Sequence, residues 1–224
     1  LATFSASSFW RDWCHCIRVF SACIRLPPLP KALLDMMFTP SNRLGSLSAD
    51  KATADKRWRI EHAQILRLED VVRFHDMGVI ASMQPSHAIG DLYFAPSRIG
   101  PRRLLGGYAW RSLIDAGAII AGGSDAPVEQ GDPRIEFYAA VARRDLQGKD
   151  GPDWHPEQAV TRAEALKMFT IWPAYASFRE ADLGTIEPGK LADFTGFTGD
   201  LMTVPDDQIL KVDPAITVVN GKIV

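Results

Sequence analysis

Apolar residues in the middle of this 224-residue chain fall into short runs that alternate with longer periodic segments. The short runs predict strands at residues 58–61, 79–83 and 118–121, because each is too brief for a helix and is bounded by polar or turn residues. Helical spacing predicts helices at residues 66–77, 101–117, 133–144 and 156–170. Alternation of strand and helix is typical of a parallel sheet with helical crossovers, so the pattern predicts an α/β fold.

The last forty residues have a different pattern. Residues 184–190 are rich in turn formers, and residues 192–197 resemble a short strand. Residues 216–224 contain two apolar runs separated by Asn220-Gly221, and Asn-Gly supplies the positive φ values of a type I′ turn. The tail is therefore predicted to be a small β unit that ends in a hairpin.

The start of the chain has no lasting helical or strand period. Only a short helix at residues 32–37 is predicted within residues 1–54, and a proline-rich stretch interrupts that region. We therefore divide the chain into an atypical N-terminal segment (residues 1–54), an α/β part (residues 55–183) and a small β portion (residues 184–224).

Composition excludes several classes of protein. The chain is 46% hydrophobic and 23% charged, which is typical of a globular domain, and its formal net charge is −2. A charge this small gives no general attraction to nucleic acid or to anionic membranes. No apolar run approaches the roughly 20 residues that span a bilayer, and no export signal is recognisable, so a cytoplasmic protein is expected.

Cysteine usage argues against a disulfide scaffold, because three cysteines cannot all pair within one chain. All three lie near the start of the chain, at Cys14, Cys16 and Cys23, and His15 lies between the first two. A zinc site there is disfavoured because the Cys-x-Cys spacing is unusual and a fourth ligand is missing.

Three polar residues follow the three predicted strands. His62 comes after the first strand, His87 lies just past the second, and Asp125 follows the third. In parallel α/β barrels the reactive side chains project from the C-terminal ends of the strands, so these residues could converge. Imidazole and carboxylate both suit Zn²⁺ and related ions, which acidify a bound water for hydrolysis.

Each of these residues also has an ordinary structural interpretation. His62 could be a satisfied core or cap histidine, His87 could be exposed in a loop, and Asp125 could cap the next turn. The two remaining histidines of this region, His75 within a predicted helix and His155 in a loop, are expected to be structural or solvated.

Four motifs occur in order, and together they are more specific than any single residue. They are Arg-Ile-Glu-His-Ala-Gln (59–64), Ser-Met-Gln-Pro-Ser-His (82–87), Gly-Tyr-Ala-Trp-Arg-Ser-Leu (107–113) and Gly-Ser-Asp-Ala-Pro-Val (123–128). This set closely resembles family 3 of the amidohydrolase superfamily, the branch with enzymes similar to D-aminoacylase and N-substituted formamide deformylase. Residues 184–193 resemble that superfamily's return from the barrel to its small β-sandwich, so the resemblance covers residues 55–224.

The resemblance implies the C-terminal part of a metal-dependent (β/α)8 barrel with a β-sandwich remnant. It implies one or two divalent metals, with zinc expected, and hydrolysis of C–N bonds in a small-molecule amide-type substrate. Position by position, His62 matches a metal-ligand histidine, and Asp125 matches an aspartate that binds metal and manages the proton of the attacking water. His87 would contact substrate, while Arg98 and Trp110 would line or support the pocket.

Departures from the family pattern qualify these expectations. No His-x-His occurs in the chain, and His15, the only histidine before His62, has surroundings that do not match the family's fifth-strand histidine. A barrel of this type takes about 250 residues, so roughly its first half is expected to be missing. The chain is accordingly expected to be weakly active or inactive alone.

Two non-catalytic interpretations remain open. A catalytically silent α/β fragment could act as a binding or interaction module and self-associate through exposed strand edges. A doubly wound binding protein is less favoured, because no glycine-rich phosphate loop follows any predicted strand.

Overall fold

A three-stranded parallel sheet forms the centre of the protein, for which the computed structural model describes residues 55–151 and 154–224. Its strands are β1 (Arg59–Glu61), β2 (Ile80–Met83) and β3 (Ile120–Gly122). Both pairings are parallel, and the spatial order β1-β2-β3 follows the order in the sequence. Each strand therefore lies beside its predecessor, as in a barrel, and the α/β prediction is confirmed.

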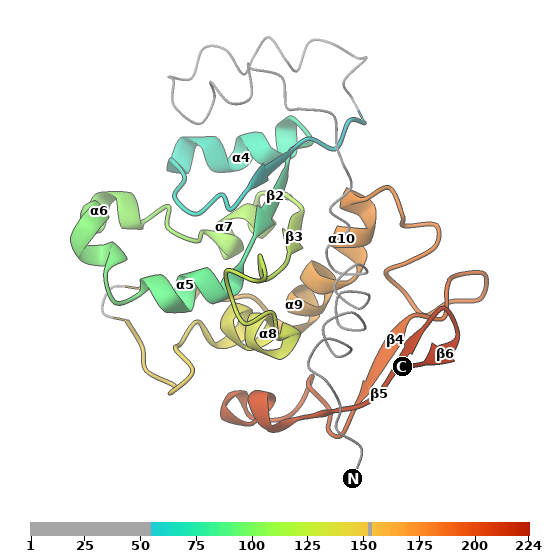
Figure 1. Ribbon diagram of the computed structural model, residues 1–224. Coiled ribbons are helices and arrows are strands. Elements are labelled where there is room, and N and C mark those ends of the chain that lie inside the picture. Colours follow the sequence, from blue (N-terminus) through green and yellow to red (C-terminus); the bar gives the residue numbers. More distant parts are fainter. Residues whose placement is uncertain (1–54, 152–153) are drawn as a thin grey trace.

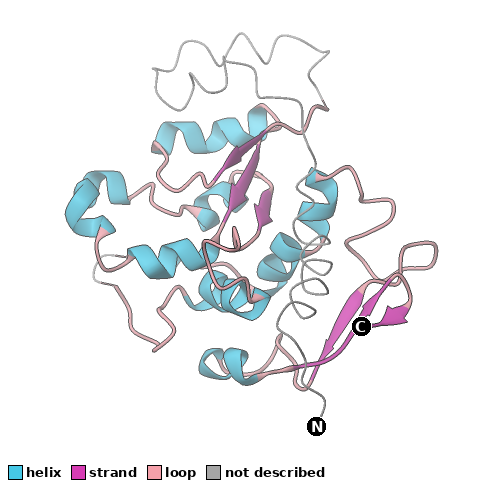
Figure 2. Ribbon diagram, in the orientation of Figure 1, coloured by secondary structure: helices cyan, strands magenta, loops and turns pink. Residues whose placement is uncertain are grey.

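Helices surround this sheet (Figure 2). The helices of the described residues are α4 (Leu68–Asp76), α5 (Pro85–Asp91), α6 (Ala95–Leu104), α7 (Trp110–Asp115), α8 (Pro133–Ala142), α9 (Arg162–Phe169) and α10 (Ile171–Ala176), with 3₁₀ turns η2 (Pro156–Gln158) and η3 (Asp206–Lys211). Helix α4 crosses from β1 to β2, and α5, α6 and α7 lie between β2 and β3.

The predicted helix at residues 101–117 is wrong, because the chain forms α6 and α7 with a break between them. Backbone groups in the break bond to the segment after β1: Leu66 N–H donates to Gly106 O, and Tyr108 N–H donates to Gln64 O. A Cβ at Gly106 would lie 1.9 Å from Leu66 O, so only glycine allows this close approach. Long-range hydrogen bonds thus replace helical ones here.

The predicted helix at residues 156–170 is also divided. One 3₁₀ turn, η2, precedes α9, and between them Ala159 is extended while Val160 N–H donates to Ala140 O of α8. Helix α9 then begins with a capping box, in which Thr161 and Glu164 exchange hydrogen bonds between side chain and backbone. The capping box starts a separate helix at Arg162, and the spacing of apolar residues alone does not predict this start.

The core lies between the parallel sheet and its helices. Ala81 and Met83 of β2 and Ile120 of β3 are fully buried, together with Trp110 and Leu113 of α7. Large buried apolar side chains each stabilise the fold by about 1.5–3 kcal/mol. This packing fixes the sheet whose C-terminal edge carries the polar residues of interest.

A second sheet forms the tail, with antiparallel strands β4 (Phe194–Phe197), β5 (Pro214–Val219) and β6 (Lys222–Ile223). Figure 1 shows it apart from the parallel sheet. Asn220 and Gly221 have φ values of 50° and 74°, so the predicted hairpin is confirmed.

Ion pairs connect this tail to the α/β part. Arg134 of α8 pairs with Asp213 at 2.7 Å, and Arg162 of α9 pairs with Asp206 at 2.6 Å. Ile209 of η3 is fully buried against the main core.

Several predictions lie outside the described residues, namely the whole segment 1–54, its helix at residues 32–37, and the disfavoured zinc site at Cys14, His15, Cys16 and Cys23. In the part of the chain that the structure describes, no helix is both long and apolar enough to cross a membrane.

Candidate functional site

Polar residues follow all three parallel strands at one edge of the sheet. His62 directly follows β1, Gln84 directly follows β2, and Asp125 comes three residues after β3. The register pairs Glu61 with Ser82 and Met83 with Gly122, so the three strand ends are nearly level. The strand-end placement of His62 and Asp125 follows the prediction from sequence.

Backbone geometry at this edge is unusual. His62 has a φ of 68° and Asp125 a φ of 56°, both in the left-handed region that non-glycine residues seldom adopt. Conformations of this kind cost free energy and occur at active sites and at turns, and other non-glycine residues of the described chain, among them Tyr108 and Arg143, share them. Both side chains are exposed.

Gln84 fixes the tautomer of His62. The distance between His62 Nδ1 and Gln84 Oε1 is 2.9 Å. Because an amide oxygen only accepts hydrogen bonds, Nδ1 carries the proton and donates it, and Nε2 keeps its lone pair. Histidines that bind metals typically donate their other ring N–H in this way.

Gln64 imposes the opposite tautomer on His87. Its amide nitrogen Nε2 lies 3.1 Å from His87 Nδ1, which therefore accepts, so His87 Nε2 carries the proton. That buried Nε2 has no hydrogen-bond partner and lies 3.7 Å from Glu129 Oε1. His87 is thus a potential donor held beside a carboxylate.

The two histidines lie against each other. Their ring centroids are 5.7 Å apart and the ring planes make an angle of 30°. His87 belongs to the first turn of α5, so its interpretation as an exposed loop residue is wrong. The crossed pairs, His62 with Gln84 and His87 with Gln64, give the two neighbouring rings opposite tautomers.

Asp125 is not a helix cap. Its carbonyl oxygen accepts from Val128 N–H in a tight turn, and the following helix, α8, is capped by Asp132 instead. The Asp125 carboxylate is therefore available at the same sheet edge as His62. Among residues 55–151 and 154–224, however, no group of three or more histidine, cysteine, aspartate or glutamate side chains is placed to hold a metal ion.

The remaining predicted site residues lie elsewhere. Arg98 is exposed on α6. Trp110 is fully buried in the core, where the guanidinium carbon of Arg143 lies 4.6 Å from its ring centroid. The histidines predicted to be structural are consistent with that role, because His75 contacts Gly117 O and His155 contacts Glu157.

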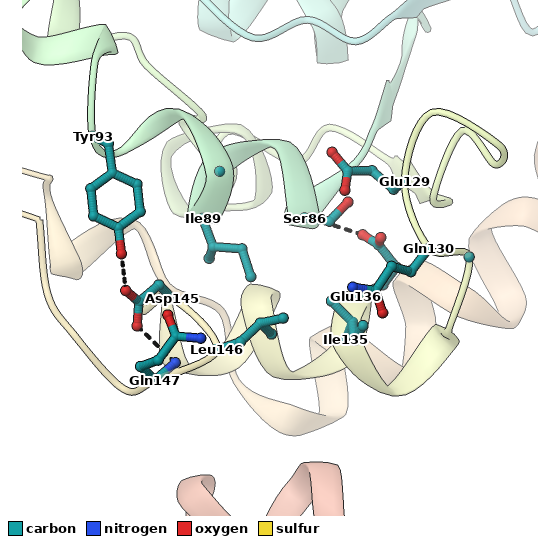
Figure 3. Close-up of a pocket in the computed structure, with 12 residues that line it drawn as sticks. Ser86, Ile89, Tyr93, Glu129, Gln130, Ile135, Glu136, Asp145, Leu146 and Gln147 are labelled. Carbon is teal, nitrogen blue, oxygen red and sulfur yellow. Dashed lines mark hydrogen bonds between the residues drawn. The ribbon is translucent and has the colours of Figure 1, made fainter.

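A cavity of about 210 Å³ lies beside His87, between α5 and α8 (Figure 3). At one end Glu136, only 2% exposed, accepts a 2.9 Å hydrogen bond from Ser86 N–H. Burial raises the pKa of Glu136 to about 7. Glu129 also lines this end.

Reasoning from the sequence assigned no role to Gln64, Gln84, Ser86, Glu129 or Glu136. A usable signal did exist for Gln84, which is polar and directly follows an apolar strand, in the same way as His62 follows β1. No comparable signal marked Glu136, because it lies within an otherwise apolar helical segment.

Comparison with known proteins shows one consistent family. The profile described as "Amidohydrolase family" matches residues 36–224. YtcJ of Bacillus subtilis (strain 168), named as an amidohydrolase, is 34% identical over 166 residues, which cover 74% of this chain and 31% of YtcJ. N-substituted formamide deformylase of Arthrobacter pascens is 32% identical over 172 residues, covering 76% of this chain and 31% of that enzyme.

A solved structure agrees with these relatives. A metal-dependent hydrolase from Pyrococcus horikoshii OT3 matches with a TM-score of 0.55 and 30% identity, covering 66% of this chain and 30% of that protein. The chain thus spans about 31% of the length of the two relatives and 30% of this structure.

Proposed function

Because this chain belongs to the amidohydrolase family, within its family 3, we propose that it is the C-terminal part of a metal-dependent hydrolase of C–N bonds in non-peptide amides. The observation that carries the proposal is His62, held by Gln84 with a lone pair on Nε2 at the edge where Asp125 also lies. The similarity to a deformylase and to a metal-dependent hydrolase supports the same class.

The donors at this edge fit a divalent ion of the zinc type. A neutral imidazole nitrogen with a fixed tautomer and a carboxylate are both common zinc ligands. The described residues supply only these two, and a catalytic zinc takes about three protein ligands, so further ligands would come from outside the described residues. When bound, such an ion acidifies water and polarises a carbonyl group.

Asp125 of this chain would carry out the proton transfers of the reaction. Water attacks the amide carbonyl carbon, and the Asp125 carboxylate accepts the proton that the water loses. As the C–N bond breaks, Asp125 returns that proton to the leaving nitrogen. His87 Nε2–H donates a hydrogen bond to the substrate, because Gln64 holds its proton on that nitrogen. Arg98, exposed on α6, and Trp110, buried in the core, would support the pocket from further out.

The sequential parallel strands β1, β2 and β3 would be the last strands of a (β/α)8 barrel, and the tail sheet would be part of a small β-sandwich. A strand order that follows the sequence supports a barrel over a doubly wound sheet, in which the order reverses at a switch point.

Elemental analysis of the purified chain tests the metal proposal. We expect about one equivalent of zinc or a similar ion in the native chain, and its loss in the double variant His62→Ala/Asp125→Ala. The matched control, His75→Ala/Asp76→Ala, removes an exposed histidine and aspartate at the end of α4 and should keep the metal. Equal metal content in both double variants would contradict the assignment.

A second candidate function is an interaction module, and the free strand edges favour it. Within the described residues β1 and β3 each pair only with β2, so each leaves one edge open. Open edges invite pairing with another chain, which supports self-association. Size-exclusion chromatography with light scattering should then show oligomers, and a clean monomer at high concentration would remove this candidate.

A further inference from the structure

The cavity between α5 and α8 has an acidic end and an apolar wall (Figure 3). Its lining includes three carboxylates, Glu129, Glu136 and Asp145, and no lysine or arginine. Ile89, Ile135 and Leu146 also line it. A volume of about 210 Å³ suits a small organic group rather than a single water.

The two ends of the cavity differ in how far their carboxylates are satisfied. Asp145 accepts from the Tyr93 hydroxyl and from the backbone N–H groups of Gln147 and Lys149, so its acceptor capacity is largely used. Lys149 also places its ammonium 5.2 Å from the Tyr93 ring centroid, close to that end. A further cation is therefore not favoured at the Asp145 end.

At the opposite end, Ser86 is the one donor that the described residues bring to Glu136. Its N–H donates to Glu136 Oε2, and while burial raises the pKa of Glu136, the Ser86 side chain, close to the same carboxylate, lowers it in part. Ser86 is 4% exposed, yet its buried Oγ makes no hydrogen bond that satisfies the geometry. Buried polar atoms without partners are rare and point to a missing donor.

A metal ion is a poor match for this end. The described residues contain no group of three or more carboxylate, imidazole or thiol side chains that converge as metal ligands. A protonated primary amine instead offers three N–H donors on one compact charge. Glu136 Oε1, the Glu129 carboxylate and Ser86 Oγ are three acceptors at the same end of the cavity.

We propose that this cavity binds an alkylammonium group, with its nitrogen between Glu136, Glu129 and Ser86 and its alkyl chain against Ile89 and Ile135. When Glu136 is ionised, a paired cation stabilises its buried carboxylate, and this ligand supplies both the charge and the hydrogen-bond donors.

The position of the cavity links it to the proposed reaction, and this step rests on the proposed function. Ser86 directly precedes His87, and Glu129 Oε1 lies 3.7 Å from His87 Nε2. An ammonium group in the cavity would thus place the rest of a substrate beside His87. The substrate class that follows is an amide that carries a separate, protonated amine.

Isothermal titration of the full chain with n-butylammonium chloride at about pH 8 tests the proposal, since an alkylamine stays protonated there, as a lysine side chain does with its pKa near 10.4. n-Butanol and sodium butyrate provide the uncharged and anionic comparisons. We expect saturable binding of the ammonium alone. Equal binding of butanol, or no binding of the ammonium by folded protein, would overturn the proposal.

Variants locate the site. Glu136→Gln keeps the side-chain shape and an oxygen for the Ser86 N–H, and should weaken ammonium binding about tenfold or more, because it removes a charge-assisted hydrogen bond. Ser86→Ala should weaken it less. Glu157→Gln, an exposed control outside the cavity, should leave it unchanged.

Folding controls keep the result interpretable. Circular dichroism of each variant establishes that it is folded, and Glu129→Gln provides a second, half-exposed test of the same acidic end. Unchanged affinity in folded Glu136→Gln and Glu129→Gln would overturn the site.

The metal-site variant separates this inference from the proposed function. His62→Ala/Asp125→Ala should bind n-butylammonium as the native chain does, because neither residue lines the cavity. If metal binding fails while ammonium binding holds, the proposed function falls and the amine site stands. If ammonium binding fails while metal binding holds, the reverse is true.

Discussion

Two polar clusters of this protein differ in whether their hydrogen-bonding groups have partners within the protein. The first, here called the arginine cluster, consists of Arg143 and its contacts. The buried Arg143 donates to the carbonyl oxygens of Trp154, Tyr108 and Gly107 at 2.9–3.0 Å, and its guanidinium lies against the ring of Trp110 in α7. At the strand-end edge, His62 and Asp125 are exposed, and within the described residues His62 Nε2 and the Asp125 carboxylate make no hydrogen bond.

The contrast distinguishes polar groups that stabilise the fold from polar groups that are available for binding and catalysis. Arg143 donates hydrogen bonds to backbone oxygens that would otherwise be buried without partners, so its role is to stabilise the fold. Within the described residues, the lone pair on His62 Nε2 makes no hydrogen bond, and neither does the proton on His87 Nε2, although Glu129 Oε1 lies 3.7 Å from that nitrogen. Groups of this kind are available to bind and react.

The largest effect on stability is expected at the arginine cluster. Arg143→Ala would leave three carbonyl oxygens without their donor and a cavity beside Trp110, and should lower the free energy of unfolding by about 3 kcal/mol or more. Urea denaturation measures the change. Arg143→Lys, which keeps the charge but not the planar fork, should lose less; an equal loss in both variants would contradict the geometric account.

The next effect concerns pH and Glu136. Its pKa is raised from 4.5 to about 7 in the folded state, so the protonated form is favoured there and its contribution to stability is complete below about pH 4.5. That contribution is lost as pH rises toward and past 7, by at most about 3 kcal/mol at 1.36 kcal/mol per pKa unit.

Urea denaturation between pH 4.5 and 8 measures this loss as the difference between native chain and Glu136→Gln. The variant cannot ionise at this position, so its stability relative to the native chain should rise with pH across that window. A difference that stays constant with pH would show that Glu136 does not titrate there.

A smaller change in stability is expected at the strand-end edge. His62→Gly relieves the steric cost of a φ of 68°, but it also removes the donor to Oε1 of the buried Gln84, so the two effects largely offset each other. Thermal unfolding should show a change of no more than about 1 kcal/mol, while metal binding is lost. Destabilisation comparable to that of Arg143→Ala would erase the contrast between the two clusters.

The smallest effect on stability, but a sharp one on spectroscopy, is expected for Gln84→Leu. The variant removes the acceptor that holds the proton on His62 Nδ1. Nitrogen-15 NMR should detect mainly the Nδ1–H tautomer of His62 in the native chain and a mixture in the variant. Metal affinity should fall about 10- to 100-fold, as for other residues that orient a ligand. The His87 tautomer, fixed by Gln64, should not change.

Local pattern was enough to predict the strands and their ends, because apolar runs end where the chain leaves the sheet. His62 and Asp125 were found in this way. The break between α6 and α7 was not, since it depends on Gly106 meeting Leu66 across forty residues of chain. The same limit applies to the Gln–His pairs and to the cavity at Glu136, whose partners come from different elements.

The crossed Gln–His pairs also have a consequence for how the sheet assembles. Each pair joins the segment after β1 to the segment after β2: His62 meets Gln84, and Gln64 meets His87. A slip of one residue between these strands would turn each side chain to the opposite face and break both pairs together. Both pairs can therefore form only when β1 and β2 are correctly registered, so the two opposite tautomers depend on the alignment of the sheet.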